Sequence, residues 1–308
     1  MIDIVAYARE SAGFTRETLA GNYTRWIIIV LLGLPWMVLT ALADSWKVID
    51  ATGVHWRNVP WGEAGLLVIA GFLCNFILTG YLVRLLRGDP APPEFSRWLL
   101  LLRDGIKVHT IPLVWMFVPL LLAYFQYSIS SSDLRSGGHI ISAMSWTTII
   151  LLLIIQLIIL FIAAQYAVVG AIRFARTGSI REAFMVLRIR ETLASIGIIN
   201  YFIGLGIITA VWIVSSYLLR IMTYVPYAGP ELTLVLSPVL TVFCIRFIAH
   251  SCDEDLPDAV REEAAVPPIP ARTVIPDTLA WLGILGVLFF LCFTPVALVV
   301  GSVTGFFT

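Results

Sequence analysis

The chain contains few residues whose type and spacing could support catalysis or metal binding. Its four cysteines form no CxxC pair, so neither a zinc site nor a disulfide framework is expected. Residues 250–253, His-Ser-Cys-Asp, combine metal-ligand types, but no second group of ligands lies elsewhere in the sequence. Motifs typical of phosphate-binding loops, serine hydrolases and zinc proteases are absent. We therefore expect no metal, no cofactor and no enzymatic activity.

Arginine is the residue type whose spacing carries the most information. Two stretches, 80–88 and 170–178, each end an apolar run with two arginines three residues apart and then reach a glycine. Residues 8–17 look like a third, degenerate copy, and either duplication or convergence would explain the likeness. The ordinary role of such arginines is to set membrane topology. A second interpretation is a surface for anionic lipid headgroups, formed by Arg84, Arg87, Arg97, Arg103, Arg173, Arg176 and Arg181.

Polar side chains within the apolar runs are the remaining candidates for chemistry. Asn75, Gln156 and Gln165 could line a polar intramembrane site, or each could hydrogen-bond a neighbouring helix. His109 follows Lys107 near the start of an apolar run and is interpreted as an interfacial residue. The centre of every run lacks Asp, Glu, Lys and Arg, so the usual machinery of proton- or sodium-coupled transport is missing.

The elements that must position these residues are transmembrane helices. Hydrophobic residues make up 59% of the 308, charged residues only 13%, and the mean hydropathy is +0.92. One soluble core could not bury so much apolar material. Runs of about 20 apolar residues cross a bilayer. We therefore predict an all-α, polytopic integral membrane protein with seven spans, at residues 26–43, 64–86, 106–128, 146–172, 196–219, 232–249 and 278–304.

The positive charges predict the orientation of these spans. Sixteen of the 20 lysines and arginines fall in the N-terminal tail and in alternate connections. Only four lie on the other side: Lys47, Arg57, Arg135 and Arg220. Because cytoplasmic connections are enriched in Lys and Arg, the N-terminus is expected in the cytoplasm and the C-terminus outside, in the cell membrane. The net charge of zero gives no reason to expect a nucleic-acid partner.

Two cytoplasmic connections contain patterns of short amphipathic helices that would lie in the membrane interface. In residues 93–103 the apolar side chains follow helical spacing after Pro93 and Glu94. In residues 179–187 Ser179 and Glu182 form a capping-box pattern, followed by one apolar face. Arginines on both helices would face lipid phosphates.

Composition divides the chain into three parts. Residues 1–249 form a six-span core with the candidate duplication. Residues 250–277 have six acidic residues between Asp253 and Glu263, followed by four prolines between Pro267 and Pro276, which is typical of a solvated, partly extended linker. Residues 278–308 contain the seventh span, which we expect to be an appendage to the core.

A recognisable series of residues ends the second span and begins the third: Gly80-Tyr81-Leu82-Val83-Arg84, Gly88, Pro92-Pro93-Glu94-Phe95, Trp98 and Asp104-Gly105. This series resembles an uncharacterised membrane-protein family, domain of unknown function 4013, found largely in archaea. Residues 95–97 depart from it, because acidic residues are expected there. Residues 175–179 and 183–184 are similar to the family's second half, and the likeness covers residues 1–250. It implies the membrane architecture but no activity and no catalytic residues.

Two functions remain open at this stage. Featureless spans, an acidic, proline-rich linker and a separate last span favour a non-enzymatic scaffold or accessory subunit with a membrane-protein partner. The candidate duplication, the prolines within spans and the polar residues Asn75 and Gln156 favour a transporter, channel or lipid-handling protein. Membrane lipids are expected partners in either case.

Overall fold

Six long apolar helices make up most of the fold. The structure is a computed structural model that describes residues 4–50, 53–88, 91–135, 146–225, 228–251, 278 and 280–281. Six of its helices are long and apolar enough to cross a membrane. They are α2 (Tyr23–Ser45), α3 (Trp61–Leu86), α4 (Trp98–Arg135), α6 (Trp146–Thr177), α8 (Ile198–Thr223) and α9 (Gly229–Ser251). Each overlaps one predicted span, so the all-α multi-span class is confirmed. Of the seventh, 278–304, only Thr278, Ala280 and Trp281 lie within the described residues.

The shorter elements lie at the ends of these helices. A two-stranded antiparallel ribbon of β1 (Ile49–Asp50) and β2 (Gly53–Val54) and the 3-10 turn η1 (Trp56–Asn58) connect α2 to α3. Two amphipathic helices, α1 (Ile4–Leu19) and α7 (Val186–Ile196), and the 3-10 helix η2 (Ile180–Phe184) complete the described elements.

Glycine ends both helices of the repeated arginine stretches. Gly88 follows α3 with a φ of 85°, and Gly178 follows α6 with a φ of 68°. This left-handed conformation is open to glycine without steric cost and lets the chain leave a helix sharply. The Gly178 N–H donates to the Phe174 carbonyl at 2.8 Å, which satisfies one of the last carbonyls of α6. The two stretches therefore end their helices in the same way.

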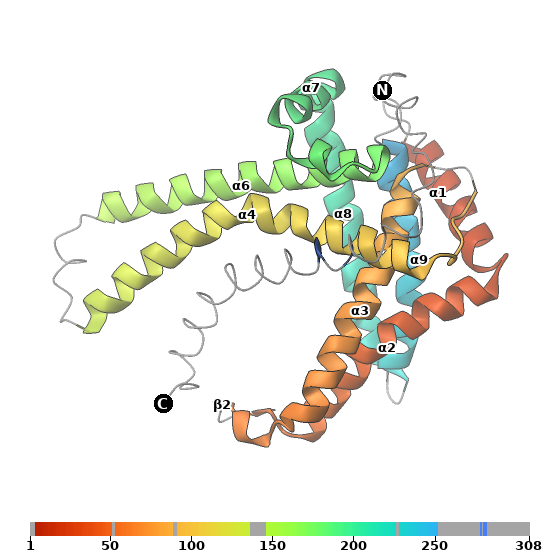
Figure 1. The fold of residues 1–308 in the computed structure, drawn as a ribbon, viewed down its shortest axis with the longest axis horizontal. Coiled ribbons are helices and arrows are strands. Elements are labelled where there is room, and N and C mark those ends of the chain that lie inside the picture. Colours follow the sequence, from red (N-terminus) through yellow and green to blue (C-terminus); the bar gives the residue numbers. More distant parts are fainter. Residues whose placement is uncertain are drawn as a thin grey trace.

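Packing is concentrated at one end of the molecule. There α1 lies against α9 and packs on the end of α3 and the beginning of α4, and the end of α6 packs against α3 and α4. We call this end of the molecule the arginine end. Tyr81, Leu101 and Phe14 meet there in one buried cluster, and Phe174 and Ile111 belong to a second. From this end the α4–α6 hairpin extends in one direction and the α2–α3 pair in another (Figure 1).

Both connections with amphipathic patterns differ from the sequence prediction. Residues 93–97 are not helical; α4 begins at Trp98 and continues without a break into the span, so the separate interfacial helix predicted over 93–103 is wrong. Phe95 instead stacks on Tyr81, with ring centroids 4.2 Å apart. The Ser179 side chain makes no capping bond. Glu182 pairs with Arg173 instead, so the capping-box prediction is also wrong.

Candidate functional site

The arginine end is the candidate site, because several helix C-termini meet there and cations stabilise helix C-termini. The helices α3, α6 and α9 all present their C-termini to it. The last carbonyls of a helix carry a partial negative charge, which cations stabilise. Four arginines are buried in this region: Arg103, Arg173, Arg176 and Arg246. The sequence predicted the side of the membrane on which these arginines would lie, but not that they would be buried.

Arg173 and Arg176 are held by protein acceptors. The Arg173 guanidinium donates to the Thr192 hydroxyl and to the Glu182 carboxylate, both at 2.5 Å, and so joins α6 to α7 and η2. The Arg176 guanidinium donates to the Ala249 carbonyl at 2.9 Å, in the last turn of α9. The two arginines of the second repeat therefore connect helices. Arg181, on η2, is exposed.

Asp104 is the carboxylate around which the first group of arginines gathers. Arg103 donates to Asp104 Oδ1 at 3.3 Å, and Arg87 Nη2 lies 3.9 Å from Asp104 Oδ2. Arg87 Nε also donates to the Ala175 carbonyl of α6 at 3.1 Å. Asp104 thereby ties α4 to α3, and through Arg87 to α6. Both Asp104 and Arg103 are buried.

Arg84 and Arg97 differ from Arg87 and Arg103, because neither makes a hydrogen bond or an ion pair with the part of the chain that the structure describes. Arg84 is half-buried and interacts electrostatically with Asp104, Arg87, Arg97 and Arg103. Arg97 is exposed and has a φ of 59°, in the left-handed region. Among the described residues, Arg84 therefore interacts with three other arginines at this corner, and two of those three contact the Asp104 carboxylate.

Glycines let the backbones cross closely at the same corner. A Cβ atom added at Gly80 would lie 1.9 Å from the Leu101 carbonyl oxygen, and one at Gly105 would lie 1.8 Å from the Phe76 carbonyl oxygen. The contact is reciprocal, since each helix contributes one glycine and one carbonyl. Gly170 plays the corresponding part against the Ala183 carbonyl, at 2.6 Å. Only glycine allows such approaches.

Helix α1 closes the arginine end, which the sequence analysis missed. Arg246 of α9 lies over the ring of Phe14, 4.3 Å from its centroid, and His250 Nε2 lies 3.1 Å from Glu10 Oε1. Ser11, Thr18 and Phe14 are buried at helical spacing. That spacing was the signal in the sequence, although its small polar residues hid it from a search for apolar runs.

The structure places the three predicted intramembrane polar residues in separate contacts. Asn75 of α3 donates to His109 Nε2 at 3.3 Å, and the Nδ1 of that histidine donates to the Gly105 carbonyl at 2.8 Å. Gln156 donates to the Pro119 carbonyl at 2.7 Å. Gln165 accepts from the Tyr201 hydroxyl. Each contact joins a different pair of helices, so these residues do not form one polar site.

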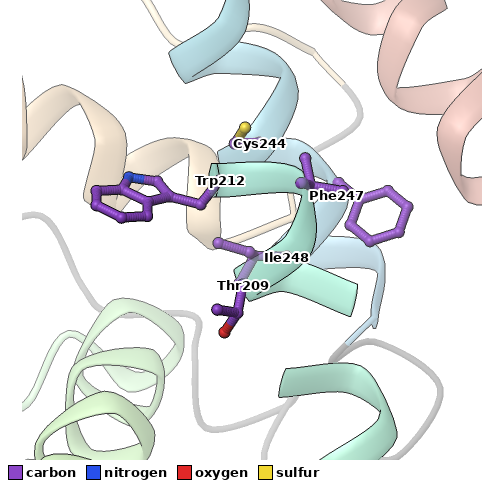
Figure 2. Close-up of a pocket in the computed structure, with 6 residues that line it drawn as sticks. Thr209, Trp212, Cys244, Phe247 and Ile248 are labelled. Atoms are coloured by element: carbon purple, nitrogen blue, oxygen red, sulfur yellow. The ribbon is translucent and has the colours of Figure 1, made fainter. Parts of the chain in front are cut away.

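A pocket of about 180 Å³ lies between α8 and α9. Trp212, Cys244, Phe247 and Ile248 line it with apolar surface, and Thr209 lies at its lower edge in Figure 2. The Cys244 thiol is 3.7 Å from the Ser215 hydroxyl. The described residues that line this pocket are mostly apolar, and such a surface suits an apolar group such as an acyl chain.

The first residues of the last apolar segment lie against the core. Thr278 is buried, and Trp281 packs on the cluster of Phe76 and Ile106 between α3 and α4. The Lys107 ammonium lies 5.4 Å from the centroid of the Trp281 ring. Among the described residues, no group of three His, Cys, Asp or Glu side chains could hold a metal ion.

Comparison with known proteins finds one matching family model, whose range includes the α3–α4 corner. Neither a curated protein nor a solved structure matches the chain. A family model described as "Protein of unknown function (DUF4013)" matches residues 64–224, which include nearly all of α3 and the whole of α4, α6 and α8. Gly80, Asp104 and Gly105, on which the resemblance was recognised, form the close crossing and its ion pair. This multi-span membrane protein belongs to the DUF4013 family.

Proposed function

We propose that the protein is a non-enzymatic membrane scaffold or accessory subunit, whose spans bind the spans of a partner membrane protein. The observation that carries the proposal is the small fraction of each span that the described chain covers. Between 6% and 28% of the residues in the most apolar stretch of each span are buried. The buried clusters lie at the arginine end, and the hairpins diverge from it (Figure 1).

Diverging spans leave apolar helix faces that another helix can cover. In lipid, helices associate through van der Waals packing, and small residues let backbones approach closely. Helix α8 is the least covered span, at 6%. On this helix, Cβ atoms added at Gly204 or Gly206 would meet nothing within 4 Å. A partner helix could approach α8 closely at either position, since residues two apart lie on opposite faces of a helix.

Helix α6 offers a second uncovered surface. Large apolar side chains from Ile150 to Ile155 are all exposed, and Leu157 is 62% exposed. Among the described residues of α6, the buried ones run from Ala163 to Arg176, in the half near the arginine end. A scaffold of this kind would use the arginine end as its base and the divergent spans as its binding surfaces.

The alternative of a transporter or channel has less support. A transport path needs polar groups that succeed one another across the membrane. Asn75, Gln156 and Gln165 each bond within a different helix pair. We propose the cell membrane as the location, with the N-terminus and the arginine end on the cytoplasmic side, in accordance with the distribution of Lys and Arg.

Site-specific photo-crosslinking in the native membrane tests the proposal. A photoreactive phenylalanine at Leu157, on the exposed face of α6, should yield one stoichiometric adduct with a partner protein. The same probe at Ala163, which is only 8% exposed, is the matched control and should not. Deleting residues 250–308 should release the partner if the last segment contributes to binding. Lipid adducts alone at Leu157, with a bare protein in native mass spectrometry, would refute the scaffold.

A further inference from the structure

The corner where α3 ends and α4 begins carries an excess of positive charge. Arg87 and Arg103 contact the Asp104 carboxylate, and Arg84 interacts electrostatically with Asp104 and with Arg87, Arg97 and Arg103. Neither Arg84 nor Arg97 forms an ion pair within the described chain. Like charges so close together are destabilising unless an anion joins them.

The beginning of α4 adds to this excess. The first N–H groups of a helix carry a partial positive charge and favour anions. Helices usually begin with Ser, Thr, Asp or Asn, whose side chains accept from these N–H groups. Here Arg97 precedes the helix, its carbonyl accepts from the N–H groups of Leu100 and Leu101, and the first turn contains no acidic residue. A cation therefore stands where a negative group is expected.

The surroundings of Arg97 identify the kind of anion. Trp98 and Leu99, the next two residues, are apolar yet 43% and 49% exposed. Phe95 stacks on both Tyr81 and Trp98, which fixes these rings beside the arginine. An exposed tryptophan next to arginines at the end of a span is typical of the membrane interface. A ligand with a phosphate for the arginines and hydrocarbon for Trp98 and Leu99 is a phospholipid.

We propose that this corner binds the phosphate of an anionic phospholipid headgroup, through Arg84, Arg97 and the N-terminus of α4. Guanidinium groups bind phosphate oxygens through paired, charge-assisted hydrogen bonds. Arg173 and Arg176 are not included, because their guanidinium groups already donate to Glu182, Thr192 and the Ala249 carbonyl. The proposal does not depend on the scaffold function and holds whether or not a partner protein exists.

The test compares two double variants of the full chain. Arg84→Gln with Arg97→Gln removes the proposed contacts, and Arg181→Gln with Arg190→Gln removes the same charge from exposed arginines nearby. Each protein is reconstituted in phosphatidylcholine nanodiscs containing a minor fraction of phosphatidylglycerol, and retained lipid is counted by native mass spectrometry. A hydrogen bond between a guanidinium group and a phosphate contributes about tenfold to binding, so the first pair should lose roughly 100-fold in preference for phosphatidylglycerol. The second pair makes no such bond in the proposed site and should lose far less, through general surface attraction alone.

Three results would overturn the proposal. Equal losses in the two double variants would mean that only general surface charge matters. An unchanged preference in the first variant would remove the site altogether. Inorganic phosphate that displaces the retained lipid completely would identify a free-phosphate site instead. If the first variant does not fold, Arg97→Gln alone repeats the test, because Arg97 is exposed and makes no hydrogen bond or ion pair with the described chain.

Discussion

Replacing Gly80 with alanine should destabilise the protein, because the added methyl group has no space at the α3–α4 crossing. The new Cβ would lie 1.9 Å from the Leu101 carbonyl oxygen and 2.7 Å from its carbonyl carbon. Ordinary contact begins at about 3.4 Å, so the two backbones would have to separate by about 1.5 Å. Leu101 is fully buried, and no flexible side chain can yield in place of the backbone.

The size of the effect follows from two opposing contributions. Overpacking a rigid core costs about 1–3 kcal/mol, and a clash with backbone belongs at the upper end of that range. Alanine in a helix interior gains up to about 1 kcal/mol over glycine. The net loss should be about 2 kcal/mol, which lowers the melting temperature by roughly 4–8 °C for a domain of this size.

Tryptophan fluorescence during a thermal ramp measures this loss in one detergent and at one scan rate, because membrane proteins often unfold irreversibly. Gly65→Ala on the same helix is the matched control, since a Cβ there meets nothing within 4 Å. It should melt at or slightly above the parent temperature. If Gly80→Ala and Gly65→Ala melt together, the close crossing of α3 and α4 does not exist.

Three further predictions concern the contacts around this crossing. Asp104→Asn should lower the free energy of unfolding by about 2–3 kcal/mol, because it removes the carboxylate that Arg87 and Arg103 contact. Added salt should restore part of the melting temperature, because it screens the repulsion between these arginines. A loss that does not depend on salt would contradict the ion-pair explanation. Phe14→Ala should lower the free energy of unfolding by about 3 kcal/mol and make α1 more sensitive to proteolysis. Glu10→Gln should lower it by less than about 1 kcal/mol, because this carboxylate is 60% exposed. Equal effects of the two substitutions would mean that other residues hold α1 in place. Asn75→Leu should cost on the order of 1 kcal/mol and leave solute flux into proteoliposomes unchanged, while an altered flux would favour the transport function.

The spans could be predicted closely from the sequence because hydropathy and backbone hydrogen bonding act together in lipid. A run such as 64–86 must be helical to satisfy its own N–H and carbonyl groups, and α3 covers Trp61–Leu86. The periodic pattern of 93–103 could not show where a helix begins. Arg97 adopts a left-handed conformation, and the same helical spacing simply continues into the span.

Which arginine side chains are buried could not be predicted from charge patterns alone. Counting Lys and Arg assigns a side of the membrane, but burial depends on which acceptors the fold brings near. Arg173 is buried because Glu182 and Thr192 approach it from two later elements. Arg97 belongs to the same predicted surface but stays exposed, because no element of the described chain covers it. Tertiary partners therefore decide which arginines join helices and which remain available to bind an anion.

The close crossing of α3 and α4, with Gly80 against Leu101 and Gly105 against Phe76, has a mechanical consequence for the protein in membranes of different thickness. It fixes α3 against α4 at the arginine end, where the backbones touch, while the far parts of both helices carry little packing. A helix whose apolar length differs from the bilayer thickness can tilt at a modest cost. The hairpins would therefore tilt about this fixed point as the bilayer thickens or thins, and the arrangement of the arginines would stay the same.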